Sequence, residues 1–423
     1  RLEQSITLTI SGKASAHAAD RSGVSVALGE PLAKAPDIGV GLDLGDAKAT
    51  REVLSSVREL RPRHLICYFD PRHGRAAEEL QDAVAIAKSL GATPWLEAVV
   101  TEVADFEREV RSLAAVVSSM GSPFDVVMLS PAADLKCTLP GSVWPPAAPA
   151  DDLFRIAREA FPGVRLGGGM FSYFTELNRK RPPLQRLDFV TFTTSVLVHA
   201  GDDVSVMEGL ESLPAIAASA RAIAGELPFS VGPSGMGMRM NPYGPAPKEN
   251  PGNNRQAMNH NDPRQRGLLG AAWILGYYAH FARGGASAVA FGGVTGALGV
   301  VHSPQAWPQP WFDEAGGLFP VFHVLRGLSG FSGCDVAALD VSAPSVVQGL
   351  AFTQGNSREI WIANLTALRQ DVALPARAAG IALLNEATFV EATRSPDYLD
   401  QLAPMDATEL ELSPFAVARI RLA

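Results

Sequence analysis

Short apolar segments alternate with amphipathic stretches along the chain from Pro36 onward. The apolar segments recur every 25 to 35 residues, roughly the rhythm of βα units that build a parallel sheet. Eight of them precede Gly330, and we expect each to form a buried strand. They cover residues 38–43, 64–70, 94–100, 125–130, 164–169, 188–194, 229–234 and 286–292.

The stretches between these segments have the spacing of amphipathic helices. They cover residues 49–60, 76–90, 101–120, 151–161 and 204–224, and a more apolar stretch, 264–283, is typical of a helix packed on both sides. Eight strands that alternate with helices over about 290 residues predict an α/β fold of the (β/α)8 TIM-barrel type. A doubly wound open sheet is the alternative, but no Gly-x-Gly-x-x-Gly turn follows the first strand.

After Gly330 the pattern changes to short alternating strands separated by turn residues. These strands are predicted over residues 346–353, 359–364, 370–374 and 410–422, and two N-terminal segments, 6–10 and 24–28, are expected to pair with them. The chain therefore divides into N-terminal strands of a sandwich (1–33), a catalytic barrel (34–332) and a C-terminal β-sandwich (333–423). The small antiparallel sandwich would be formed from both chain ends.

Composition narrows the function classes. The net charge is −8, from 36 Lys and Arg against 44 Asp and Glu, and no dense basic run is present, which argues against nucleic acid as a partner. No apolar run reaches the roughly 20 residues that span a bilayer, so no membrane association is expected. Cys67, Cys137 and Cys334 are widely spaced and give neither a zinc framework nor a disulfide scaffold, which favours the cytoplasm; a secreted chain with one disulfide is the alternative.

In a TIM barrel, catalytic residues project from the carboxyl ends of the strands and from the loops that follow. The polar residues at these places are too numerous for packing alone. They are Asp43, Asp46, Tyr68, Asp70, Arg72, His73, Glu97, Ser130, Lys136, Tyr173, Glu176, Asn178, Thr193, His199, Asp202, Asp203, Ser234, Arg239, Asn241, Tyr243 and His302.

The densest cluster follows the fifth strand, where three glycines at 167–169 precede Tyr173, Glu176 and Asn178. Glycines let the backbone approach a ligand closely. A carboxylate in such a cluster acts as a general acid or base once burial raises its pKa. The structural alternative is a glutamate near a helix end, paired with Arg179 or Lys180.

A second cluster, with His199, Asp202 and Asp203, lies in the loop after the sixth strand. His199 would serve as base, proton carrier or metal ligand, with an aspartate that fixes its tautomer. Alternatively, Asp202 or Asp203 only caps the helix that begins at Val204.

The third cluster is an irregular segment of nearly 30 residues, 235–263, and segments of this length usually form a lid or a binding loop. Its amides and guanidinium groups suit a substrate rich in hydroxyls or bearing a carboxyl group. A plain surface loop is the alternative. The residues that we assign to binding here are Asn241, Tyr243, Asn259 and His260, with Arg239 in a catalytic role.

Other chemistries have weaker signals. Glu97 lies inside its strand and either faces the pocket or is buried in a salt bridge. A metal site built from Asp43, Glu97, His199 or His260 would lack diagnostic spacing, so we expect no metal and no cofactor. Ser234 lacks the Gly-x-Ser-x-Gly spacing of a nucleophile elbow.

A barrel with a sandwich resembles the clan-A glycoside hydrolases, but the segment 229–239 lacks the carboxylate that would be their nucleophile. The segments 170–179, 188–194, 198–208 and 231–244 look like the D-apionate lactonase family. The resemblance covers about residues 165 to 300. It implies a bacterial enzyme of carbohydrate catabolism that opens the lactone ring of a branched-chain sugar acid.

Lactone hydrolysis needs a base that activates water, donors that hold an oxyanion, and an acid for the ring oxygen. Our hypothesis is that Glu176 or His199 activates water, and that Arg239 and Asn241 stabilise the oxyanion. Substrate hydroxyls and the rest of the sugar lactone would contact Glu97, Tyr173, Asn178, Asp203, Tyr243, Asn259 and His260. The alternatives are a glycoside hydrolase that pairs Glu176 with Glu97 or Asp203, and a noncatalytic sugar-acid-binding barrel.

Overall fold

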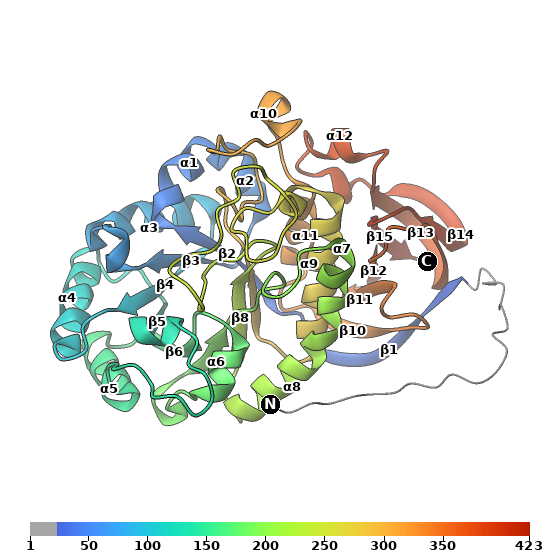
Figure 1. Cartoon of the computed structure of the whole chain (residues 1–423). Helices are drawn as coiled ribbons and strands as arrows, with labels where there is room; N and C mark the ends of the chain where they lie inside the picture. Colours follow the sequence, from blue (N-terminus) through green and yellow to red (C-terminus); the bar gives the residue numbers. More distant parts are fainter. Residues whose placement is uncertain (1–22) are drawn as a thin grey trace, which may run out of the picture.

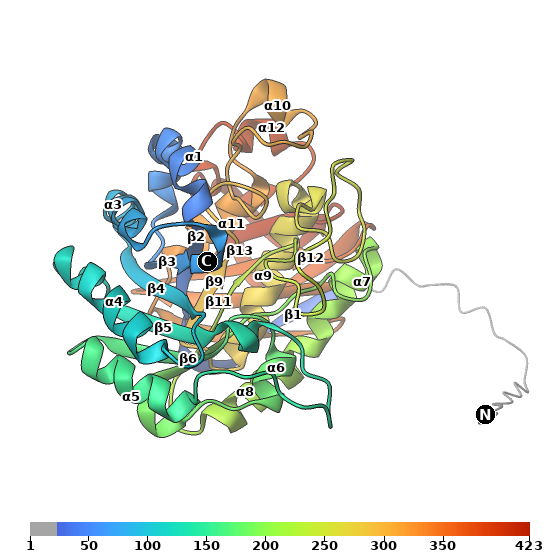
Figure 2. The same ribbon diagram turned by 60° about the vertical axis from the view of Figure 1, so that its left-hand side comes forward.

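The computed structural model describes residues 23–423, so the strand predicted over residues 6–10 lies outside the described residues. Eight parallel strands close into a barrel (Figure 1 and Figure 2). Every predicted barrel strand corresponds to one of them, which confirms the TIM barrel and makes the open sheet wrong. The strands are β2 (Asp37–Asp43), β3 (His64–Phe69), β4 (Thr93–Val100), β5 (Val126–Pro131), β6 (Arg165–Met170), β7 (Phe189–Phe192), β8 (Phe229–Ser234) and β9 (Ala288–Phe291).

Helices cover the outside of the barrel, and one short helix, α12 (Phe389–Ala392), belongs to the C-terminal unit between β13 and β14. The others are α1 (Ala47–Glu52), α2 (Leu54–Val57), α3 (Leu80–Leu90), α4 (Phe106–Ser119), α5 (Ala150–Ala160), α6 (Phe174–Arg179), α7 (Asp203–Glu208), α8 (Leu213–Ala224), α9 (Leu268–Arg283), α10 (Phe312–Ala315) and α11 (Pro320–Ser329). As predicted, α9 is buried almost throughout, because it packs against both the barrel and the sandwich. Among the described helices, none has the length and apolar character that crossing a membrane requires.

Two of the predicted helices are interrupted, and four helices lie outside the predicted stretches. The stretch 204–224 divides into α7, a 3₁₀ turn and α8, where Pro214 lies in the first turn. Proline is tolerated there because the first-turn N–H groups have no partner within the helix. The stretch 49–60 likewise divides into α1, α2 and a 3₁₀ turn. The helices outside the predicted stretches are α6, α10, α11 and α12.

Side chains fill the amino-terminal end of the barrel. The His64 ring stacks on Trp95 at a centroid distance of 4.0 Å. A Cβ atom at Gly39 would lie 2.1 Å from Nε2 of His64, so only glycine leaves room for this ring. Burial lowers the pKa of His64 to about 3, and the ring is therefore neutral. The opposite, carboxyl-terminal end of the barrel is where a ligand can enter.

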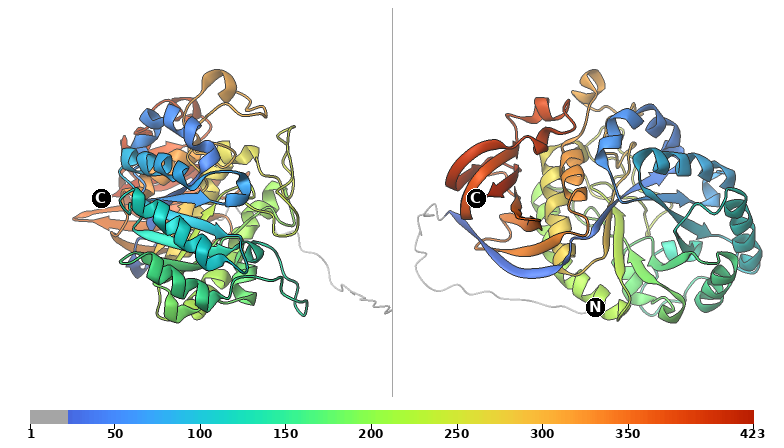
Figure 3. Two further views of the ribbon diagram at one scale, coloured as in Figure 1. Left: turned by 90° about the vertical axis from the view of Figure 1, so that its left-hand side faces the viewer. Right: turned by 180° about the vertical axis from the view of Figure 1, so that it is seen from behind.

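The second unit is a mainly antiparallel sheet in the order β1-β10-β11-β12-β15-β13-β14. Its orange and red strands lie beside the barrel in the right-hand view of Figure 3. The blue strand β1 lies among the red C-terminal strands because it pairs with β10 and, in parallel, with β13, so both chain ends build this unit as predicted. Its strands are β1 (Val24–Lys34), β10 (Asp335–Val341), β11 (Val347–Gln354), β12 (Ser357–Asn364), β13 (Gln370–Leu384), β14 (Ala403–Leu412) and β15 (Val417–Leu422).

The sandwich differs from the prediction in three elements. Strand β13 runs to Leu384, whereas the predicted strand ended at residue 374. The segment 410–422 is not one strand, because Pro414 and a Phe415 with φ of 54° turn the chain between β14 and β15. Strand β10, which pairs with β1 and β11, was not predicted. The core of this unit includes the alternate residues Ile360 and Ile362 of β12.

Candidate active site

A cavity of about 630 Å³ opens at the carboxyl ends of the barrel strands β2, β3, β8 and β9. Active sites of TIM barrels lie at this end. Its polar wall combines carboxylates with cations and comes from four loops. The residues are Asp43 and Asp46 after β2, Tyr68, Asp70, Arg72 and His73 at the end of β3, Lys136 after β5, and Arg239, Asn241 and His260 after β8.

Arg239 forms an ion pair through Nη2 with Oε1 of Glu97, and its guanidinium lies over the Tyr68 ring at 4.6 Å. The strand register explains this grouping, because Asp43, Tyr68 and Glu97 are successive partners across β2, β3 and β4. Trp95 belongs to the cluster inside the barrel, and Glu97, two residues further, faces the same way. Glu97 thus forms the buried salt bridge that was one of its two expected roles.

The electrostatics of this pair keep Arg239 charged. Burial acts against the charge of the guanidinium, but Glu97, Tyr68 and Asp43 outweigh it and raise the Arg239 pKa. Burial also raises the pKa of Glu97, and Arg239 opposes that shift. The Nη1 nitrogen of Arg239 is buried and has no hydrogen-bond partner among the described residues. Such an unpaired donor costs about 1–3 kcal/mol, so an oxygen that reached it would be bound favourably.

Asp70 anchors the other side of Tyr68. The Tyr68 hydroxyl donates to Oδ2 of Asp70 at 3.0 Å, and Arg72 donates to both carboxylate oxygens. Burial alone would raise the pKa of Asp70, but the hydrogen bonds from Arg72 outweigh it and lower that pKa. Asp70 is therefore an ionised carboxylate whose charge is balanced by Arg72.

Asp43 is the last residue of β2, and Asp46 follows three residues later. Asp43 is exposed and accepts a hydrogen bond from the Gly45 N–H at 2.8 Å. Asp46 is half-buried, and burial together with the charge of Asp43 raises its pKa to about 6. The cavity is also lined by residues to which the sequence-based hypothesis gives no role. They are Asp43, Asp46, Tyr68, Asp70, Arg72, His73 and Lys136. Each of them is among the polar residues that the sequence places at the carboxyl ends of the strands.

The long loop after β8 supplies Arg239, Asn241 and His260 to the cavity wall, as expected of a binding loop. His260 Nδ1 lies 2.9 Å from the carbonyl oxygen of Met238 and so acts as the donor, which leaves Nε2 as the acceptor in the neutral ring. The Asn241 side chain bonds within the loop itself: its amide nitrogen donates to the Ala246 carbonyl, and its amide oxygen accepts from the Tyr243 N–H. The Lys136 ammonium donates to the carbonyls of Asn241 and Gly244 and secures the same turn.

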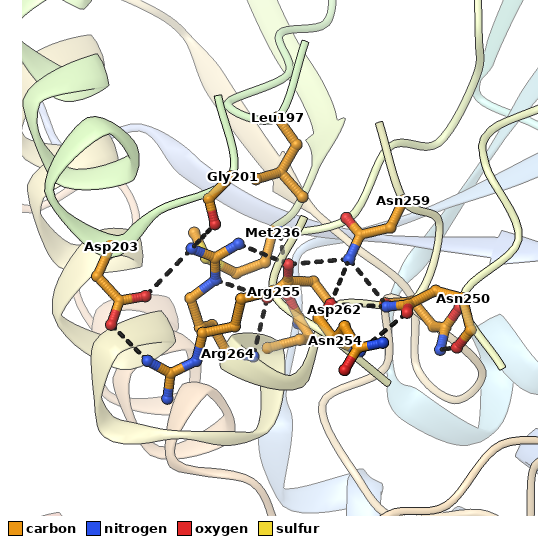
Figure 4. A network of polar contacts seen from close by, with 12 residues as sticks. Leu197, Gly201, Asp203, Met236, Asn250, Asn254, Arg255, Asn259, Asp262 and Arg264 are labelled. Carbon is orange, nitrogen blue, oxygen red and sulfur yellow. Dashed lines mark hydrogen bonds and ion pairs between the residues drawn. The ribbon is translucent and has the colours of Figure 1, made fainter. Parts of the chain in front are cut away.

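A polar network holds the far part of this loop (Figure 4). The buried Arg264 donates to both oxygens of Asp262, to the Gly201 carbonyl and to Asp203. The Asn259 amide donates to Asp262 at 3.1 Å. Asp203 and Asn259, both expected to read substrate hydroxyls, thus connect the loops after β7 and β8 and do not line the cavity.

Glu176 lies outside the cavity wall. Its buried carboxylate accepts a hydrogen bond from Arg179 at 3.0 Å and one from the Thr138 N–H at 3.4 Å. This is the structural alternative that the sequence had left open. Tyr173 is buried near the cavity, and its hydroxyl donates to the carbonyl of Met240, which is a wall residue.

The remaining expected residues are at the surface. His199 and Asn178 are exposed, and Tyr243 is 51% exposed. None of the three lines the cavity. Asp202 accepts a hydrogen bond from the Ser205 N–H at 2.9 Å and so caps α7. Within residues 23–423, no three His, Cys, Asp or Glu side chains gather closely enough to hold a metal ion.

Comparison with known sequences identifies two matching family models. The first, described as D-apionate lactonase, TIM barrel domain, matches residues 38–333. The second, described as D-apionate lactonase, C-terminal immunoglobulin-like domain, matches residues 344–420. A D-apionate lactonase from Brucella anthropi is 38% identical over 351 residues, which cover 83% of this chain and 56% of that protein. The chain thus spans little more than half the length of this curated relative.

Solved structures share the fold at low sequence identity. A family 51 α-L-arabinofuranosidase from Bifidobacterium longum has a TM-score of 0.63 and 12% identity, over 94% of this chain and 99% of that chain. A 4-O-α-L-rhamnosyl-β-D-glucuronidase from Fusarium oxysporum has a TM-score of 0.61 and 9% identity, over 94% of this chain and 100% of that chain. At such identities the likeness concerns the barrel with its sandwich alone.

Proposed function

Because the chain belongs to the D-apionate lactonase family, we propose that it hydrolyses the lactone ring of a small sugar acid, converting D-apionolactone to D-apionate. The enzyme would thus be a carboxylic ester hydrolase of carbohydrate catabolism. Its three free cysteines agree with the cytoplasm as the place of action.

The observation that carries this proposal is the guanidinium of Arg239 in the cavity wall, with one donor nitrogen unpaired. When water attacks a lactone carbonyl, negative charge develops on the carbonyl oxygen. A fixed cation at that position stabilises the transition state more than the ground state. Glu97 and Tyr68 hold Arg239 in place before substrate arrives, so no reorganisation is required during the reaction.

The rest of the wall suits a polyhydroxylated ring. Carboxylates such as Asp43 accept hydrogen bonds from hydroxyls, and the Nε2 atom of His260 is a further acceptor. The volume of about 630 Å³ falls within the usual range for small-molecule sites.

A pH-stat assay tests the proposal, because each lactone opened releases a proton from the new carboxylic acid. The purified chain is offered a panel of aldonolactones, with and without a chelator, and a parallel panel of aryl glycosides. We expect saturable proton release with D-apionolactone above the spontaneous rate and no release of phenol. Cleavage of an aryl glycoside without lactone opening, or binding without turnover, would overturn the proposal.

A further inference from the structure

The carboxylates of the cavity differ in whether they already have a partner. Asp70 is held by Arg72 and Tyr68, and Glu97, deeper in the barrel, is held by Arg239. Asp46, by contrast, has no ion-pair partner among residues 23–423, and it makes no capping hydrogen bond to α1. A half-buried carboxylate with no matching cation is costly to keep and is characteristic of catalytic groups.

The backbone positions Asp46 firmly. It ends the 3₁₀ turn at 44–46 that follows β2 and precedes α1. From the other side, the segment after β9 approaches so closely that a Cβ atom on Gly296, at φ of 80°, would lie 2.5 Å from Oδ2 of Asp46. Thr295 in that segment is also bonded to Thr50 of α1 at 2.8 Å. The carboxylate therefore sits between two connected segments at the rim of the cavity.

We propose that Asp46 is the general base that activates the attacking water, an inference that rests on the proposed lactone hydrolysis. Asp46 takes one proton from water as the water oxygen bonds to the carbonyl carbon, and the carbonyl electron pair moves to the oxygen held by Arg239. As this oxyanion collapses, the bond between the carbonyl carbon and the ring oxygen breaks. The ring oxygen takes the proton back from Asp46, which regenerates the carboxylate.

The surroundings of Asp46 raise the pKa of its carboxyl group toward the value that suits a general base. Burial and the nearby charge of Asp43 raise its pKa to about 6, so near pH 7 it is mostly ionised and yet a stronger base than an ordinary aspartate. Asp43 lies on the same segment as Asp46. The segment after β9 brings the backbone of Gly296 against the Asp46 carboxylate. The other titratable groups of the same cavity are Tyr68, Asp70, Arg72, His73, Lys136, Arg239 and His260.

The first test is the pH profile of kcat/KM for lactone hydrolysis between pH 4.5 and 7.5, corrected for spontaneous opening. In the wild type we expect an acid limb centred at about pH 6, where Asp46 loses its proton. Asp46→Asn should lower kcat by at least ~100-fold, the usual scale for loss of a general base, and should remove the limb. Asp152→Asn, on the exposed face of α5, is the matched control and should leave the profile unchanged.

Asp43→Asn gives a second readout that does not depend on how well Asp46→Asn folds. It removes the charge that helps to raise the pKa of Asp46, while the amide oxygen still accepts from the Gly45 N–H. The acid limb should therefore move to lower pH in this variant. An unmoved limb in Asp43→Asn, or a normal rate and limb in Asp46→Asn, would overturn the role of Asp46. A wild type without lactonase activity would instead overturn the proposed function.

Discussion

The polar side chains at the open end of the barrel fall into two sectors. In the β6–β7 sector, which comprises Tyr173, Glu176, Asn178, His199 and Asp203, the buried polar groups have partners within the protein and the others face solvent. In the β2–β3–β8 sector, which comprises Asp43, Asp46, Tyr68, Asp70 and Arg239, charged groups line a cavity and two of them are incompletely matched.

The two sectors thus differ in how completely their charged groups are matched, and this difference is our reason for proposing the β2–β3–β8 sector as the site. Glu176 has Arg179 and the Thr138 N–H as donors, so a substrate would have to displace them. Arg239 and Asp46 keep donor and acceptor capacity that the protein does not use. Leaving that capacity unused destabilises the unliganded protein, and a ligand that pairs with these groups would offset part of this cost.

The largest effect that would test the comparison is expected at Arg239. Arg239→Lys keeps a positive charge beside Glu97 but removes the planar guanidinium and its unpaired nitrogen. We expect kcat/KM for the lactone to fall by about 100- to 1,000-fold, the range for loss of one oxyanion donor. Steady-state kinetics measure this. Arg255→Lys, on the exposed part of the same loop, is the control; an equal loss in both variants would remove the distinction between the sectors.

The next effect concerns stability. Glu97→Gln leaves the guanidinium of Arg239 buried without its counter-charge, which should lower the free energy of unfolding by about 3–5 kcal/mol. Urea denaturation at pH 7 measures the change. The control is Glu411→Gln, which breaks the exposed pair with Arg369 and should cost about 1 kcal/mol or less. Similar losses in the two variants would mean that the buried pair does not hold the site in place.

A smaller stability effect of opposite sign is expected at Asp46. Its folded-state pKa of about 6 lies above the reference value of 3.8, so wild-type stability falls as the pH rises through 6. Asp46→Asn has no such cost. The variant should become more stable than the wild type by ~1–2 kcal/mol at pH 8, with little pH-dependent gap near pH 4. Thermal unfolding at both pH values measures the gap, and a constant gap would contradict the raised pKa.

The barrel could be predicted from the sequence, whereas the pairing of the polar residues at its open end could not. The barrel strands were predictable because each is a short apolar run bounded by polar residues, and the strand-end rule already included Asp46 and Tyr68. The sequence could not show which of these polar residues are paired within the protein, because their partners are distant along the chain. Glu97 and Arg239 are 142 residues apart, and Asp46 meets the backbone of Gly296. Glu176 and Arg179, in contrast, are neighbours on one helix turn, and their pairing was recognisable as an alternative.

The smallest effect is expected at His199, which the sequence had suggested as a base. Its side chain is exposed and does not line the cavity, so His199→Ala should change kcat/KM by less than about twofold, as surface substitutions usually do. The sharpest comparison is His260→Ala, because it removes the same kind of ring from the cavity wall and should raise KM. A loss of kcat in His199→Ala, with His260→Ala normal, would mean that the loop after β7 closes over the substrate. The reaction would then belong to the β6–β7 sector after all.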